Sequence, residues 1–175
     1  MAAAPADELA PLVVLAEKIQ ALLVERQLTL STAESCTGGL VGHVLTEVPG
    51  SSDYYVGGVV SYSDELKRSE LDVDERTLEQ HGAVSAQVCI AMADGSRRRH
   101  GSSLAVGVTG IAGPSGGSAA KPVGLTYVAV ADEAGHDVRR HIWHADRHAN
   151  KVLSARAALA LVLERLGFPP EAETV

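Results

Sequence analysis

The chain has 175 residues, about the size of one ordinary domain, and 46% of them are hydrophobic although only 3% are aromatic. A core made mostly of Ala, Val and Leu suits a layered α/β domain and excludes disorder, collagen and an aromatic platform for stacked bases. Fifteen basic against 22 acidic residues give a formal charge of −7, which disfavours a protein that coats nucleic acid.

The first half of the chain predicts helices alternating with strands. Apolar residues recur at helical spacing over residues 8–26, and a short strand follows over 28–32. Thr37 is placed to cap a second helix, which Pro49-Gly50 would stop. A buried strand over 57–62, a short helix over 75–80 ended at Gly82, and a helix from the N-cap Ser85 to Arg98 come next.

The second half predicts three strands and a final helix. A strand over 104–109 leads into an irregular segment rich in Gly and Pro, and strands over 125–131 and 137–144 form an antiparallel hairpin at one side of the sheet. The last helix ends at Gly167, with Pro169-Pro170 beyond it. This order predicts one domain over residues 1–175 with a three-layer α/β/α sandwich around a mixed, mainly parallel sheet.

Two features of the sequence indicate the cellular compartment of the protein. The apolar run over residues 9–16 is short, contains Pro11 and follows two acidic residues, so it predicts neither a membrane span nor a signal peptide. The two cysteines, Cys36 and Cys89, are far apart and form neither a disulfide framework nor a CxxC metal pair. We therefore expect a cytoplasmic protein without membrane partners.

The loops that follow the strands are the first place to look for chemistry, because ligands of open α/β sheets bind beyond the carboxyl ends of strands. The loop over 34–39 places Ser35 at a strand-to-helix turn, where Gly38 and Gly39 leave backbone N–H groups open. That arrangement suits an acyl-transfer nucleophile and also a phosphate site. The alternative is that Ser35 and Thr37 are only helix caps.

The segment over 62–67, at the end of a strand and the start of a predicted helical turn, supplies a candidate base. A buried Lys67 with a lowered pKa could accept the proton of a serine, and the hydroxyl of Tyr62 could relay it. The alternative is an exposed lysine on the polar face of residues 63–68. Cys36, next to Ser35, stays open as a second candidate nucleophile, although no sequence feature places a histidine beside it.

The loop over 110–121 is not a Walker loop, because no GK[ST] closes it. Its glycines permit close approach to a ligand, and Lys121 could meet a phosphate. Residues 118–121 match the SxxK pattern, but the glycines before them and Pro122 after them argue against the helix that this pattern needs. The histidines lack acidic or cysteine partners at ligand spacing, so no metal site is predicted.

Five ordered motifs resemble the CinA C-terminal domain family, which includes the nicotinamide-nucleotide amidohydrolases of PncC type. The motifs lie at residues 32–39 (TAESCTGG), 50–52 (GSS), 58–67 (ending YSDELK), 81–85 (HGAVS) and 109–117 (TGIAGPSGG). The resemblance covers about residues 10–166. Long members of the family carry a further N-terminal domain, and this chain resembles the stand-alone form.

The resemblance implies hydrolysis of nicotinamide mononucleotide to nicotinic acid mononucleotide and ammonia, in pyridine-nucleotide salvage, without a cofactor or metal. The catalytic positions it implies are Ser35, Tyr62 and Lys67, with backbone N–H groups near residues 37–39 holding the oxyanion. The matched positions expected to contact the substrate are Glu34, Thr37, Gly38, Gly39, Ser52, Tyr55, Thr109, Gly110, Gly113, Gly117, Lys121 and Arg147.

Several alternatives remain open at this stage. Ala145 stands where the family tends to have a Gly, so an added methyl group changes the fit of that loop, while Arg147 is still available for a phosphate. A non-catalytic nucleotide-binding protein, or a partner associated with competence or DNA damage, is the alternative function. Tyr54 or Tyr55 could pack in the core instead of facing a pyridinium ring. Trp143 and the outer hairpin strand suggest a homo-oligomer.

Overall fold

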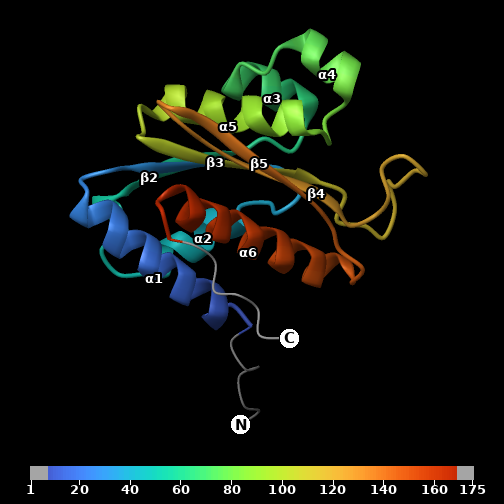
Figure 1. Cartoon of the computed structure of the whole chain (residues 1–175). Coiled ribbons are helices and arrows are strands. Elements are labelled where there is room, and N and C mark those ends of the chain that lie inside the picture. Colours follow the sequence, from blue (N-terminus) through green and yellow to red (C-terminus); the bar gives the residue numbers. More distant parts are fainter. Residues whose placement is uncertain (1–7, 169–175) are drawn as a thin grey trace.

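The computed structural model describes residues 8–168, which form one five-stranded sheet between two layers of helices (Figure 1). The strand order is β2-β1-β3-β4-β5. The strands are β1 (Leu30–Glu34), β2 (Tyr55–Val60), β3 (Leu104–Gly110), β4 (Leu125–Asp132) and β5 (Gly135–Ile142). β1 pairs in parallel with β2 and β3, whereas β4 runs antiparallel to β3 and β5, so β4 alone opposes the other described strands. The predicted mixed, mainly parallel sheet and its hairpin are confirmed.

The helices cover both faces of the sheet, as the three-layer prediction requires (Figure 1). One face carries α1 (Ala10–Glu25), α2 (Leu40–Thr46) and α6 (Arg147–Arg165), and the other carries α3 (Asp64–Leu71), α4 (Glu75–His81) and α5 (Ala86–His100). The larger apolar cluster fills the layer under α1 and α6 with side chains such as Ile19 and Leu159. Smaller clusters containing Met92 and Ala93 lie under α5. No helix within residues 8–168 combines the length and apolar character that a bilayer crossing needs.

Two boundaries near the first candidate loop differ from the prediction. β1 ends at Glu34, two residues later than expected, and α2 begins only at Leu40. Gly38 and Gly39 have φ values of 65° and 96°, a left-handed conformation that the first turn of a helix excludes. The prediction that Thr37 caps α2 is wrong, because its hydroxyl donates to Glu34 Oε2 at 2.6 Å and Gly39 is the N-cap.

The segment after β2 forms a complete helix, where the sequence predicted only a helical turn. The hydroxyl of Ser63 accepts the N–H of Leu66 at 3.2 Å, and two acidic residues occupy the first turn of α3. Both features stabilise a helix start. The buried side chains of this helix are Lys67 and, one turn later, Leu71, so Lys67 lies on the inner face.

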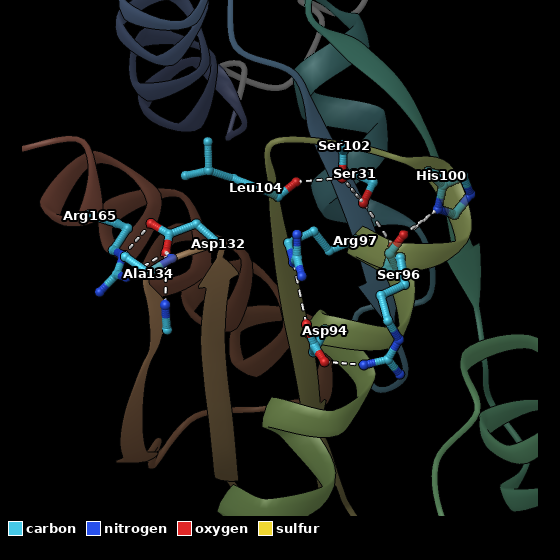
Figure 2. Close-up of polar contacts among 12 residues, drawn as sticks. Ser31, Asp94, Ser96, Arg97, His100, Ser102, Leu104, Asp132, Ala134 and Arg165 are labelled. Carbon is cyan, nitrogen blue, oxygen red and sulfur yellow. Dashed lines mark hydrogen bonds and ion pairs between the residues drawn. The ribbon is translucent and has the colours of Figure 1, made fainter.

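At the amino ends of β1 and β3, a buried hydroxyl cluster joins β1, α5 and the loop that precedes β3 (Figure 2). Ser31 Oγ lies 2.9 Å from the hydroxyl oxygens of both Ser96 and Ser102. Ser96 Oγ also donates to the carbonyl of Thr32, and Ser102 Oγ donates to the carbonyl of Leu104. These bonds satisfy the hydroxyls and offset much of the cost of burying them.

The last helix agrees with its predicted end. α6 runs to Arg165, its C-cap is Leu166, and Gly167 follows with a φ of 82°. Pro169-Pro170 lies outside the described residues.

Candidate active site

A cleft of about 260 Å³ opens at the carboxyl ends of the parallel strands. It is lined by residues of all three candidate loops, by Ala83 and Val84 ahead of α5, and by Arg147 at the start of α6. Ser35 is the first residue after β1, and its N–H donates to the carbonyl of Val108 in β3 at 2.9 Å. Its hydroxyl therefore projects from a fixed backbone, and the residue is 8% exposed.

Lys67 lies beside this serine and is 1% exposed, so the reading of it as a solvated surface lysine is wrong. Its Nζ donates to the carbonyl oxygen of Ser61 at 3.0 Å and lies 3.5 Å from Ser35 Oγ. Burial lowers the pKa of this lysine, and the nearby carboxylate of Asp64 opposes that effect. A lysine with a lowered pKa at this distance from a hydroxyl is suited to accept its proton.

Tyr62 stands at the mouth of the cleft and is 60% exposed. Its hydroxyl accepts a hydrogen bond from Arg147 Nη2 at 3.0 Å, and Arg147 Nη1 donates to the carbonyl of Gly113 at 2.7 Å. The guanidinium therefore bridges the loop after β2 and the loop after β3. The tyrosine does not lie between Ser35 and Lys67, because these two side chains contact each other directly.

Glu34 is buried directly beneath the Ser35 turn. Its carboxylate accepts the Thr37 hydroxyl and the N–H groups of Gly39, Val41 and Gly42, at 2.6 to 3.1 Å. An internal anion therefore fills the positive end of α2. The N–H of Gly38 is donated to the carbonyl of Ser35. The expectation that the amides of Gly38 and Gly39 hold an oxyanion is wrong, because both are already donated within the loop.

The loop after β3 contributes only part of its predicted residues. Thr109, Gly110 and Gly113 line the cleft, and the hydroxyl of Thr109 donates to the carbonyl of Ala83 at 2.9 Å. Gly117 and Lys121 are not among the lining residues. The Lys121 ammonium donates instead to the carbonyl of His81 at 2.6 Å, which ties the loop to the end of α4.

Two predicted substrate contacts, Ser52 and Tyr55, and the alternative Tyr54 lie at or just before the amino end of β2. Ser52 lies in the short helical turn before β2, at the amino end of the strands, whereas the cleft lies at the carboxyl end. The Tyr55 hydroxyl is 2.9 Å from Thr32 Oγ1 and its ring packs against the core. Tyr54 is fully buried, and its hydroxyl donates to the carbonyl of Leu45. The structure does not bring these three residues to the cleft.

Cys36 lines the cleft next to Ser35. Burial raises the pKa of its thiol to about 12, an effect that nearby Lys67 and Lys151 only partly oppose. Because the thiolate is the nucleophilic form, this thiol is inert near neutral pH. This raised pKa, together with the 3.5 Å distance between Lys67 Nζ and Ser35 Oγ, favours Ser35 over Cys36 as the nucleophile.

Sequence reasoning missed two groups that touch the base. Asp64 Oδ1 lies 3.6 Å from Lys67 Nζ, and the carbonyl oxygen of Ser61 accepts from the same amine. The i, i+3 spacing of Asp64 and Lys67 would have indicated the first contact once α3 was recognised as a helix. No sequence pattern predicts the second contact, because its acceptor is the main-chain carbonyl of Ser61. Within residues 8–168, no three His, Cys, Asp or Glu side chains gather as a metal site would require.

Comparison with protein families gives one match, to the CinA C-terminal domain over residues 13–166. Among curated proteins, a CinA-like protein of Geotalea uraniireducens is 46% identical over 148 residues, which is 85% of this chain and 35% of that protein. A putative competence-damage inducible protein of Moorella thermoacetica is 47% identical over 83% of the chain and 35% of that protein. The chain thus spans about a third of the length of the curated relatives it matches.

The fold is also similar to that of solved structures that carry competence-related names. The competence/damage inducible protein CihA of Agrobacterium tumefaciens has a TM-score of 0.83 at 40% identity, covering 95% of this chain and 99% of that one. The competence damage-inducible protein A of Klebsiella pneumoniae has a TM-score of 0.86 at 34% identity, covering 89% and 96%. Both structures span nearly the same segment as this chain.

Proposed function

The chain belongs to the CinA C-terminal domain family, and from this membership and the cleft we propose that it is a serine amidohydrolase that removes the carboxamide nitrogen of nicotinamide mononucleotide. One observation carries the proposal: the buried amine of Lys67 lies 3.5 Å from the hydroxyl of Ser35. Burial of this lysine lowers its pKa, and the lowered pKa lets the neutral amine accept the serine proton.

The reaction begins with proton transfer from Ser35 Oγ to the neutral amine of Lys67 as Oγ attacks the carboxamide carbon. The new bond joins Oγ to carbon, and the carbonyl electron pair moves onto oxygen. Cys36 is the residue directly after the nucleophile. Within residues 8–168, its backbone N–H donates to no backbone carbonyl. We assign the oxyanion to this N–H, the position that a nucleophile turn commonly provides.

The C–N bond then breaks, and Lys67 returns its proton to the leaving nitrogen, so that ammonia departs and an acyl-serine remains. A water molecule attacks the acyl carbon and gives a proton to Lys67. Ser35 Oγ leaves as the second tetrahedral intermediate collapses and regains that proton. In these steps atoms, protons and electrons balance without a metal or a redox partner.

A phosphorylated substrate fits the charge of the cleft. Arg147 lines it, and the hydrogen bonds that its guanidinium donates within residues 8–168 go to neutral acceptors, the Tyr62 hydroxyl and the Gly113 carbonyl. Since Glu34 already fills the end of α2, we assign the phosphate to Arg147. Arg147→Met should raise KM for the mononucleotide at least tenfold while leaving KM for nicotinamide riboside within about twofold, as measured by ammonia release.

The decisive experiment measures ammonia release from nicotinamide mononucleotide by the metal-free protein. Ser35→Ala should abolish release while sparing nucleotide binding, and Cys36→Ala should retain activity. The opposite pattern would move the nucleophile to Cys36. Binding without release and without a trappable acyl-serine would replace the enzyme with a non-catalytic nucleotide-binding protein.

The proposed compartment is the cytoplasm. Cys36 and Cys89 are both buried free thiols, and a reducing environment maintains this state.

A further inference from the structure

Three oxygen acceptors surround the amine of Lys67. They are the carbonyl of Ser61 at 3.0 Å, Ser35 Oγ at 3.5 Å and Asp64 Oδ1 at 3.6 Å. A protonated lysine has three N–H groups, so each acceptor can face one of them. A neutral amine has two N–H groups and one lone pair, and a base must direct that lone pair at the hydroxyl it deprotonates.

We propose that Asp64 is a positioning residue: together with the Ser61 carbonyl it holds the two N–H groups of neutral Lys67, so that the lone pair faces Ser35 Oγ. The inference rests on the amidase function proposed above. Asp64 acts through the Lys67 amine, which its carboxylate faces at 3.6 Å. Its carboxylate is 62% exposed at the cleft, whereas the lysine it faces is 1% exposed.

The charge of Asp64 has a second effect, on the pH at which Lys67 becomes neutral. Burial lowers the pKa of Lys67, and the Asp64 carboxylate acts in the opposite direction because it stabilises the ammonium. The other charged or titratable groups that face this part of the cleft are Cys36 after β1, Tyr62 after β2 and Arg147 on α6. The Cys36 thiol is neutral near pH 7, since its pKa is raised to about 12. Among the described residues that line the cleft, Asp64 is the one carboxylate.

Two substitutions separate orientation from charge. Asp64→Asn keeps an oxygen acceptor but removes the charge, and Asp64→Ala removes both. Glu65→Gln is the matched control, because it removes the same charge from the next residue of the same helix turn, which is exposed and does not line the cleft. The pH profile of kcat/KM for ammonia release is measured for all four proteins.

Activity should rise with pH as Lys67 loses its proton. D64N should move this acidic limb to lower pH by about one unit and keep the alkaline plateau within about threefold. D64A should move the limb equally and lower the plateau about tenfold, because the lone pair is no longer directed. E65Q should match the wild type in both respects. A limb that stays in place in D64N, or a D64N plateau as low as that of D64A, overturns the proposal.

A second readout needs no substrate. The rate at which a fluorophosphonate modifies Ser35 should follow the same limb, and D64N should shift it by the same amount. A shifted labelling limb without any ammonia release would refute the proposed substrate and retain the role of Asp64. Ammonia release with unshifted limbs in both assays would refute the role of Asp64 and retain the enzyme.

Discussion

Glu34 is one residue before the nucleophile, yet its contribution is to the backbone. The carboxylate is 1% exposed and is surrounded by donors from the turn and from the first residues of α2. It therefore takes the place of a side-chain cap for α2, a helix that is preceded by two left-handed glycines and whose N-cap is Gly39. The position of the Ser35 turn depends on this one side chain.

Glu34→Gln should show this dependence. An amide nitrogen can accept no hydrogen bond, so at least one N–H of α2 is left without an acceptor, and we expect a loss of about 2–3 kcal/mol in the free energy of unfolding. Urea unfolding measures the loss, and kcat should fall with it. Glu47→Gln changes the same charge at the exposed far end of α2 and should alter stability by less than about 0.5 kcal/mol. Equal effects of both substitutions would contradict the capping role.

At the scale of elements, α3 and α5 pack with their backbones in close contact. A Cβ added at Gly95 of α5 would lie 1.9 Å from the carbonyl oxygen of Leu71, at the end of α3. Position 95 thus needs a glycine for space, although glycine weakens a helix. The close approach fixes the end of α3, the helix that carries Lys67.

Gly95→Ala should therefore destabilise the protein in spite of the better helix propensity of alanine. We expect a loss of at least about 2 kcal/mol, because backbone atoms must move apart to admit the methyl group. Thermal unfolding measures it. Gln87→Ala, at an exposed position of the same helix, should be neutral or slightly stabilising. A G95A protein as stable as the wild type would show that α3 can shift freely.

The elements themselves could be predicted largely from sequence, because helical periods and turn residues are local signals. α6, α5 and the hairpin all lie close to their expected limits. The details of the site depended on contacts between distant segments. No local pattern shows that Glu34 would turn inward to cap α2, or that Tyr62 would be held by Arg147, 85 residues later in the chain. The sequence left Lys67 either buried or exposed, and α3 decides between the two because it places Lys67 and Leu71 on its buried face.

At the scale of the whole molecule, an ion-pair cluster ties the last helix to the hairpin at the amino end of the sheet (Figure 2). Arg165 donates to both carboxylate oxygens of Asp132, at 2.7 and 2.8 Å, and to Asp137 at 2.8 Å. Hydrogen bonding from Arg165 is the main reason that the pKa of Asp132 is lowered. This contact joins α6, in one helical layer, to β4 and β5 of the sheet.

The sign of the pH effect follows from that lowered pKa. Asp132 stabilises the fold fully above its unfolded pKa of about 3.9, and the contribution disappears as pH falls through the lower folded value. Asp132→Asn should therefore cost about 1–2 kcal/mol at pH 7, and the difference from the wild type should shrink below about pH 4. Denaturant unfolding at several pH values measures it. Glu133→Gln, at an exposed position of the same turn, is the control and should change the free energy of unfolding at pH 7 by less than about 0.5 kcal/mol.

The protonation state of the Cys36 thiol also determines which reagents react with the residues of the cleft. A pKa of about 12 keeps this thiol protonated near pH 7. Alkylating agents and mild oxidants, which attack thiolates, should leave the protein intact, while acylating agents aimed at serine should inactivate it. A serine-directed electrophile is therefore the suitable reactive group for an inhibitor of this cleft. Mild oxidants should not inactivate the protein through Cys36.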